Sequence, residues 1–467
     1  MGISKKLGED DGNFVVGDRR EKMGLAQGGW VVYSGETMYD LEEESRRKEK
    51  VLLVGTGPKS RRGELIESLE ELGLLAETAG GDVAEKVLHI REKPDAATMI
   101  GKGKARRIEE IRTQLEVDTV VFDQELSSAQ IRNLEAIIAA KILDRTELIL
   151  DIFALHARTM EAKIEVELAQ LSYRLPRLTG KGIDLSRLGG GIGTRGPGEK
   201  KLEVERRRLR DRMKKLKDEL KSVEKARAVQ RKRRHSMFRV ALAGYTDAGK
   251  STIMNALTKA GVRTEKALFT TLDPTTRLLQ FENGRKALIT DTVGFIRDLP
   301  HHLVASFRST LDEAVEADLR LRIVDVSHPE FESHMDAGSA VLRDLGCLNK
   351  RNILVFNKID RLLDREVLTG LSRRYTGCLC VSALTGEGMD RLLFALEAEM
   401  EREVIEGRFR LPLENGKLIS AVHELGEVLD TSFGGGYVEL NARLHKSDFE
   451  RIRKLTLEAG GEVKPWR

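Results

Sequence analysis

The stretch Gly244-Tyr245-Thr246-Asp247-Ala248-Gly249-Lys250-Ser251 decides the fold of this chain. It consists of a glycine, four residues and then Gly-Lys-Ser, which is the pattern of a phosphate-binding loop. A mostly apolar run at 237–243 precedes the loop and suits a buried strand, and residues 252–257 follow as a helix. A strand, a tight glycine turn and a helix N-terminus together form an anion cradle, because backbone N–H groups and the positive end of the helix dipole point into it.

Two side chains of this loop are candidates for direct chemistry. Lys250 can reach the β- and γ-phosphates of a nucleotide and assist catalysis, and the Ser251 hydroxyl can ligate Mg²⁺. The alternative is a glycine-rich turn that matches by chance, which the strand before the loop and the helix after it disfavour. We therefore predict nucleotide binding by the whole loop, Gly244, Tyr245, Thr246, Asp247, Ala248, Gly249, Lys250 and Ser251.

A second motif, Asp291-Thr292-Val293-Gly294, follows the apolar run 287–289. An acidic residue at the end of a buried strand can help to hold Mg²⁺, and a glycine lets the backbone approach the γ-phosphate. We predict that Asp291, Thr292, Val293 and Gly294 bind the nucleotide and that Gly294 takes part in catalysis. Taken alone, the motif could equally be an ordinary polar turn after a strand.

Two further motifs indicate which base is bound. Asn357-Lys358-Ile359-Asp360 follows the apolar run 353–356, and Ser382-Ala383-Leu384 follows another at 379–381. A carboxylate such as that of Asp360 only accepts hydrogen bonds, so it suits guanine, which offers two adjacent donors. Four motifs in this order, each after an apolar strand, indicate a GTPase similar to the translation-factor-related class over about 237–400. A metabolic kinase is disfavoured because the Asn-Lys-x-Asp motif serves guanine recognition.

Length and composition exclude several other classes. At 467 residues the chain has room for about three domains at roughly 150 residues each. It has no apolar run near the ~18–20 residues that span a membrane, and its charged N-terminus lacks a signal-peptide core. The three cysteines form no metal or disulfide pattern, so core packing is the favoured role. We expect a cytoplasmic protein that does not associate with membranes.

Positive charge is concentrated in one segment. The net charge is only +4, from 79 basic and 75 acidic residues. Residues 195–234, however, hold 18 Lys or Arg against 7 Asp or Glu, a local excess of 11. A basic segment on an otherwise acidic protein indicates a polyanionic partner. A solvated helix face is the alternative.

Apolar spacing around this segment predicts two long helices. Leucine and related residues recur at four- and three-residue intervals over 164–175 and again over 209–223, so that each helix has one apolar seam and the two can pack as an antiparallel hairpin. The glycine-rich loop 179–198 joins them and carries three basic loop residues, Lys181, Arg187 and Arg195. A loop this long and glycine-rich indicates either a functional segment that pairs with phosphates or a flexible linker.

The remaining segments complete a five-part organisation. Residues 1–49 are polar and are expected to be a disordered extension. An N-terminal α/β domain is expected at 50–157, with strands at 51–54, 97–100 and 119–122 and helices at 63–72, from about 105, and at 128–139. The helical hairpin is placed at 158–234 and the GTPase domain at 235–403. A small C-terminal α+β domain is placed at 404–467, with strands near Ile419 and at 437–440 and a helix from Ser447.

Along about 50–467 the chain resembles the HflX family of ribosome-associated GTPases. The resemblance rests on the glycine loop 189–198, the phosphate loop, the segment 269–277 (Phe-Thr-Thr-Leu-Asp-Pro-Thr-Thr-Arg), the segment 291–295 and Asn357–Asp360. It implies a P-loop GTPase domain with the three accompanying parts described above. It also implies binding to the large ribosomal subunit and its RNA through the hairpin loop, and a role in splitting stalled ribosomes.

The resemblance also assigns residues. Phe269, Thr270, Thr271, Leu272 and Asp273 match the switch segment that binds GTP, and Thr271 matches the switch threonine that is a second Mg²⁺ ligand and takes part in catalysis. One departure is Asp247, where the family usually has asparagine. A carboxylate near the phosphates should weaken nucleotide binding unless Mg²⁺ or a hydrogen bond offsets its charge.

Phe295 occupies the position at which Ras-like enzymes carry the glutamine that orients water. Phenylalanine cannot orient water, so we expect slow hydrolysis that depends on a group from a partner or on ordering of the switch. Phe295 can also simply pack beneath the switch. We predict a monomeric GTP hydrolase that converts GTP to GDP with Mg²⁺. A nucleotide-dependent RNA-binding regulator, for which hydrolysis is incidental, is the alternative.

Overall fold

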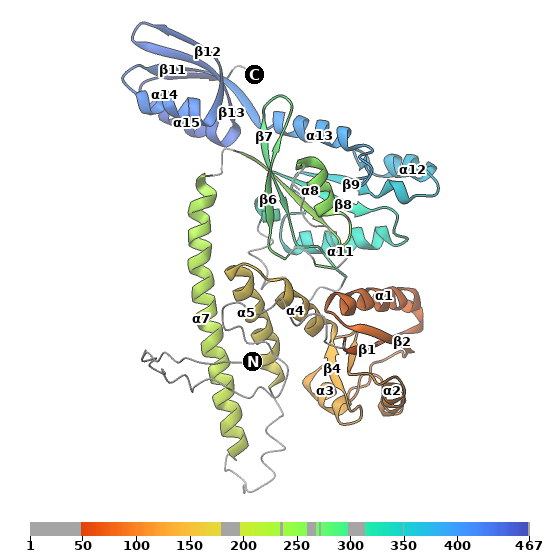
Figure 1. The fold of residues 1–467 in the computed structure, drawn as a ribbon. Helices are drawn as coiled ribbons and strands as arrows, with labels where there is room; N and C mark the ends of the chain where they lie inside the picture. The colour runs from red at the N-terminus through yellow and green to blue at the C-terminus, as the bar shows by residue number, and fades with distance from the viewer. Residues whose placement is uncertain are drawn as a thin grey trace, which may run out of the picture. The chain divides into compact units, whose positions relative to one another are not determined.

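The computed structural model describes residues 48–178, 197–233, 237–258, 268–269, 272–297, 313–348 and 350–465. Within these residues the chain forms three β-sheets, and a pair of helices lies in sequence between the first and the second (Figure 1). This arrangement confirms the predicted α/β fold. None of the described helices is both long enough and apolar enough to cross a membrane. The predicted extension at 1–49 lies almost wholly outside the described residues.

The first sheet is fully parallel, with the order β2-β1-β3-β4. Its strands are β1 (Lys50–Gly57), β2 (Asp82–Ile90), β3 (Thr119–Phe122) and β4 (Lys141–Asp144). Its helices are α1 (Arg62–Thr78), α2 (Lys102–Leu115), α3 (Ser128–Glu135) and α4 (Arg145–His156). Successive β1 residues point to opposite faces, so Leu53 packs with α1 and α4 whereas Leu52 packs with α2. Helices therefore cover both faces, as a parallel sheet requires.

One expected strand of this domain was wrong, and two of its strands, β2 and β4, were not predicted. Residues 97–100 form a turn, closed by a bridge between Asp95 and Met99, because the Asp95 carboxylate accepts hydrogen bonds from the backbone N–H groups of Ala97 and Thr98 at 3.0 and 2.9 Å. The second strand is β2 instead. It lies at the edge of the sheet and is largely half-exposed, so it lacks the apolar run by which β1 and β3 are recognised.

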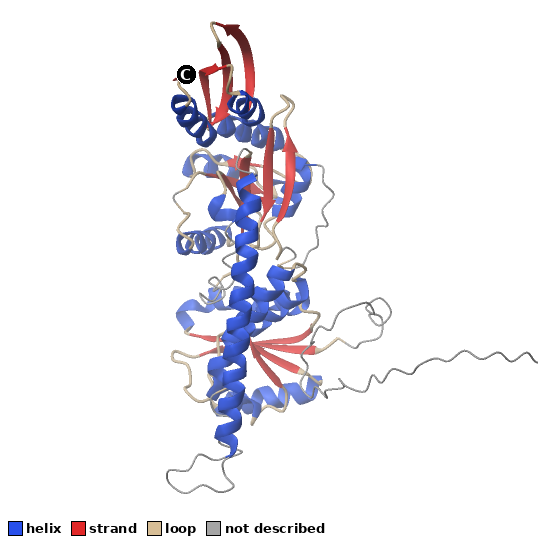
Figure 2. Cartoon of the chain, turned by 90° about the vertical axis from the view of Figure 1, so that its left-hand side faces the viewer, coloured by secondary structure: helices blue, strands red, loops and turns tan. Residues whose placement is uncertain are grey.

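The predicted pair of long helices is present as α5 (Met160–Arg177) and α7 (Pro197–Arg233). Figure 2 shows α7 as one long, continuous helix. The two helices pack through the expected seam, and Ile164, Leu168 and Leu216 are buried in it. Arg212 of α7 adds an ion pair with Glu167 of α5, with 2.7 Å between Nε and Oε1. The basic loop residues lie outside the described residues.

The second sheet has the order β10-β9-β8-β5-β7-β6, and only β6 is antiparallel to its neighbour. Its strands are β5 (Phe238–Gly244), β6 (Thr275–Gln280), β7 (Lys286–Asp291), β8 (Leu319–Asp325), β9 (Asn352–Asn357) and β10 (Leu379–Cys380). Its helices are α8 (Lys250–Thr258), α11 (Phe331–Asp344), α12 (Glu366–Arg374) and α13 (Met389–Glu401). Helices α8 and α13 share one core with the sheet. The carboxyl ends of β5, β7, β8 and β9 meet at one edge, which is where ligands bind in open α/β sheets.

The third sheet is antiparallel, with the order β12-β13-β11-β14. Its strands are β11 (Val404–Pro412), β12 (Gly426–Gly434), β13 (Tyr437–His445) and β14 (Glu462–Pro465), accompanied by α14 (Gly416–Leu425) and α15 (Lys446–Glu458). The predicted strand near Ile419 was wrong, because this residue lies within α14. The Asn415 side chain caps that helix, and Leu418 and Val422 bury one face at the four-residue spacing of a helix.

Candidate nucleotide-binding site

The phosphate loop connects the last residue of β5, Gly244, to the first residue of α8, Lys250. Two of its glycines are required by close contacts. A Cβ atom on Gly244 would lie 2.2 Å from the carbonyl oxygen of Ile323, and one on Gly249 would lie 2.3 Å from Asn357 Nδ2. Gly249 also has a φ of +88°, which disfavours other residues. Close contacts with Ile323 of β8 and Asn357 of β9 thus require glycine at both positions, in agreement with the predicted tight turn.

Lys250 is a buried cation inside this turn. Its Nζ donates hydrogen bonds to the carbonyl oxygens of Gly244 and Tyr245 at 3.2 and 2.8 Å. Burial lowers the pKa of the Lys250 amine, and the nearby Asp291 and Asp247 carboxylates partly oppose that shift. A buried ammonium gains from a negative partner at hydrogen-bond distance, which the phosphates of a nucleotide can supply.

Ser251, one of the two predicted Mg²⁺ ligands, contacts Asp291, the acidic residue that we expect to help hold the ion. Ser251 Oγ donates to Asp291 Oδ2 at 2.5 Å, which joins the start of α8 to the end of β7. A hydroxyl and a carboxylate are the hard oxygen donors that Mg²⁺ prefers, and Mg²⁺ usually takes one or two such protein ligands together with phosphates. The two residues therefore fit the ion. Thr271 and its neighbour Thr270 lie outside the described residues.

The segment after β7 is hydrogen-bonded to the phosphate loop. The backbone N–H of Phe295 donates to Gly244 O at 3.0 Å, and that of Thr246 donates to Phe295 O at 2.8 Å. Gly294 lies against the loop so closely that a Cβ atom there would be 2.9 Å from Lys250 Nζ. Residues 291–295 and 244–251 therefore form one compact unit, with Gly294 beside the lysine amine.

The base-recognition residues come together at the ends of β9 and β10. Asn357 links two loops, since its Nδ2 donates to Ala248 O at 2.9 Å and its Oδ1 accepts from Ala383 N at 3.1 Å. Asp360 Oδ1 accepts a hydrogen bond of 2.6 Å from Ser382 Oγ, which orients the carboxylate. The structure thus brings the two base motifs into contact with each other and, through Asn357, with the phosphate loop.

Asp247 has the partner that its charge requires. Its backbone adopts a left-handed φ of 59°, and its Oδ2 lies 3.0 Å from Lys358 Nζ. The same ammonium lies 2.7 Å from Asp325 Oδ2, at the end of β8. The Lys358 hydrogen bond offsets the Asp247 carboxylate, so the departure from asparagine costs less nucleotide affinity than an unpaired charge would.

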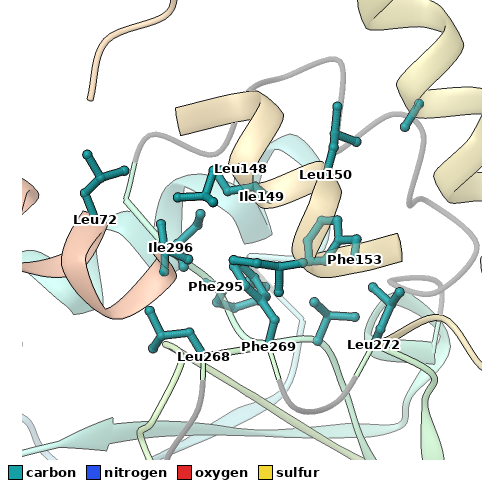
Figure 3. Close-up of a cluster of buried hydrophobic side chains, with 14 of the residues drawn as sticks. Leu72, Leu148, Ile149, Leu150, Phe153, Leu268, Phe269, Leu272, Phe295 and Ile296 are labelled. Carbon is teal, nitrogen blue, oxygen red and sulfur yellow. The ribbon is translucent and has the colours of Figure 1, made fainter. Parts of the chain in front are cut away.

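Phe295 and the described part of the switch segment enter an apolar cluster with the N-terminal domain. Phe295, Phe269 and Leu272 are between 1% and 3% exposed, and they share one core with residues of α1 and α4 such as Leu72 and Phe153 (Figure 3). Phe295 therefore packs beneath the switch. Because its side chain is inside this core, it cannot place a water molecule on the nucleotide.

Polar contacts cross the same boundary, and the sequence offered no signal for them. Tyr245 Oη donates to Glu71 Oε1 of α1 at 2.7 Å and accepts from Arg297 N at the same distance. Glu71 is also paired with the buried Arg145 of α4, with 2.7 Å between Oε2 and Nη2. The pairs join residues that are up to 174 positions apart, and no motif in the chain links them.

Known protein families match nearly the whole described chain. The families described as GTP-binding GTPase N-terminal and GTP-binding GTPase middle region match residues 66–154 and 156–234. The family described as 50S ribosome-binding GTPase matches 239–358, and the HflX C-terminal domain matches 370–464.

Full-length relatives agree with these families. The GTPase HflX of Caldanaerobacter subterraneus subsp. tengcongensis is 43% identical over 89% of this chain and 96% of its own length. That of Lacrimispora saccharolytica is 45% identical over 87% of this chain and 96% of its own. That of Escherichia coli is 39% identical over 83% and 92%. The matched families together reach from residue 66 to residue 464, and each of these relatives aligns with more than four fifths of this chain.

Proposed function

Because this chain belongs to the HflX family of ribosome-binding GTPases and hydrolyses GTP, we propose that it binds the large ribosomal subunit and splits stalled ribosomes in its GTP-bound state. The observation that supports this proposal most is the combination in one chain of a compact guanine-nucleotide site with a long, basic helical pair. The nucleotide site provides a switch between GTP-bound and GDP-bound states, and the helical pair provides a surface for RNA.

In the proposed site each part of the nucleotide has its own set of residues. Lys250 and the backbone of the loop neutralise and orient the phosphates. Ser251 and Asp291, with Thr271, hold Mg²⁺, which supplies charge stabilisation to the transferring phosphoryl group. Asp360 accepts hydrogen bonds from guanine, and Ser382 keeps its carboxylate in place.

Hydrolysis in this site requires that a water molecule be oriented toward the nucleotide, and the buried Phe295 cannot orient it. Without a residue at that position to orient water, the isolated protein turns over slowly. We propose that ribosome binding orients the attacking water molecule, either through a group of the ribosome or by fixing the switch segment. GTP hydrolysis then follows binding and releases the protein.

Helix α7 supports contact with RNA through its exposed side. The seam residue Leu216 is fully buried against α5, whereas the basic residues around it are exposed, among them Arg207, Arg208, Arg210, Lys214, Lys215, Lys217 and Lys221. Asp211 and Asp218 are exposed among these residues, but the basic side chains outnumber them, and a helix face with a net positive charge suits a polyanion such as ribosomal RNA. Each phosphate that this surface neutralises releases counterions, so binding should weaken steeply with salt.

Co-sedimentation with separated ribosomal subunits tests the proposal. We expect the protein to pellet with large subunits when a non-hydrolysable GTP analogue is present, and to pellet much less with GDP or with small subunits. The same samples with GTP should show faster phosphate release when large subunits are added. Equal pelleting with both subunits, without acceleration of hydrolysis, would instead favour the RNA-binding regulator.

A further inference from the structure

Asp273, at the end of the switch segment, is bound to the beginning of α5. Its Oδ2 accepts hydrogen bonds from the backbone N–H groups of Arg158 and Thr159 at 2.9 and 3.0 Å, and its Oδ1 accepts one from Thr159 Oγ1. Thr159 is the N-cap of α5, and its Oγ1 also accepts from Ala162 N at 3.2 Å. The carboxylate thus engages a helix N-terminus, where the dipole favours negative charge.

Phe269, four residues earlier, is attached to the helix that precedes α5. Its ring meets Phe153 of α4 edge-on, with 4.7 Å between the centroids and an interplanar angle of 78° (Figure 3). Its φ is +57°, which is uncommon for a bulky residue and is kept only where the surroundings hold it. Leu268 is also held, since its N–H donates to Thr78 Oγ1 of α1 at 3.2 Å.

The two anchors lie on either side of Thr270 and Thr271 in the sequence, and both attach to the junction of α4 and α5. From that junction α5 runs into the pair that it forms with α7, through the apolar seam and the Arg212–Glu167 ion pair. A series of described contacts therefore connects the helical pair to Asp273 and Phe269, the two anchored residues of the switch segment.

We propose that Asp273 is a positioning residue for GTP hydrolysis, which ties the switch segment to α5 so that ribosome binding by the helical pair changes the hydrolysis rate. The inference rests on the proposed function for its effector, the large subunit. The assignment differs from the sequence prediction for Asp273, because the carboxylate serves the helix rather than the nucleotide. Phe269 and Phe153 form the second anchor of the same device.

The measurable quantity is the stimulation factor, defined as the hydrolysis rate with large subunits divided by the rate without them. Thr159→Val removes one of the three hydrogen bonds and should lower this factor about threefold, whereas Asp273→Ala removes all three and should lower it about tenfold. Thr159→Ser keeps the hydroxyl and should restore the factor to within about twofold of the original protein.

Ser127→Ala is the matched control for the loss of a helix cap. Ser127 caps α3 through Gln130 N, so its replacement removes a contact of similar strength in the N-terminal domain without touching the switch segment. Thermal unfolding should change to a similar extent in Ser127→Ala and Thr159→Val, while the stimulation factor should fall only in the second. If the stimulation factor falls equally in Ser127→Ala and Thr159→Val, the loss of a helix cap explains the effect. Coupling between α5 and the switch segment is then not needed, and the inference is overturned.

A double variant makes the test specific to the contact. Adding Thr159→Val to Asp273→Ala should lower the stimulation factor no further, because both changes act on one interaction. If the original protein is stimulated by large subunits and Asp273→Ala retains the full factor, the inference is wrong although the proposed function stands. If the original protein neither pellets with large subunits nor responds to them, the proposed function fails first.

Discussion

Asp360→Asn should convert the guanine site into one that prefers xanthine. The Ser382 hydroxyl accepts from Thr385 N at 3.1 Å, so its single proton is free to go to Asp360 Oδ1. In the variant the amide oxygen keeps that hydrogen bond, and the amide nitrogen takes the place of the other carboxylate oxygen. A donor then meets the donors of guanine, whereas xanthine offers an oxygen at the same position.

The size of the change follows from the lost contacts. Hydrogen bonds to a charged group contribute about 1.5–3 kcal/mol each, and at least one of those from guanine to Asp360 is lost. We therefore expect GTP affinity to fall about 10–100-fold, or more if both bonds are lost. The xanthosine nucleotide gains a hydrogen bond, so the ratio of the two affinities should shift by about 1,000-fold.

Competition binding measures this ratio directly. A fluorescent GDP analogue is displaced by GTP or by xanthosine triphosphate from the original protein and from the variant at the same Mg²⁺ concentration. Ser382→Ala serves as the control, because it releases the carboxylate without changing its chemistry and should lower GTP affinity by about tenfold with no gain for xanthosine. An unchanged preference for GTP in Asp360→Asn would remove Asp360 from base recognition.

Four other variants have defined outcomes. Lys250→Ala and Ser251→Ala should each lower GTP affinity or turnover by about 10–100-fold in a phosphate-release assay, through lost phosphate and Mg²⁺ contacts. Alanine at all three basic loop residues should weaken pelleting with large subunits and flatten its salt dependence. Burial and then the Asp144 charge raise the pKa of Glu147 to about 7, so the folded state holds a proton that the unfolded state releases and stability falls as pH rises from about 4.5 to 7. Glu147→Gln should remove that fall and gain about 3 kcal/mol at pH 8 in urea unfolding, and a parallel pH profile for both proteins would contradict the assignment.

The sequence predicted the turn of the phosphate loop because the strand, the glycine loop and the helix follow one another directly in the chain. The close contacts of Gly244 with Ile323 and of Gly249 with Asn357 agree with the glycines that the motif requires. Strand β2 was missed because a half-exposed edge strand carries no apolar run, and the helix at Ile419 was missed because its spacing was not recognised as helical. These failures lie away from the site.

Contacts between the parts of the chain could not be predicted in this way. Asp273 and Thr159 are 114 positions apart, and neither residue type indicates the other. The same holds for Tyr245 and Glu71, which join the phosphate loop to α1. A single sequence shows which side chains can accept a hydrogen bond, but the partner is set by how separately folded sheets and helices pack together.

Sucrose-gradient sedimentation of intact ribosomes tests the central proposal most directly. Ribosomes are incubated with the full chain and either a non-hydrolysable GTP analogue or GDP, and the proportions of intact ribosomes and free subunits are measured. We predict that the GTP analogue converts intact ribosomes into subunits, with the protein found on the large subunit, and that GDP leaves them intact. Intact ribosomes with both nucleotides, or equal splitting with both, would contradict the proposal.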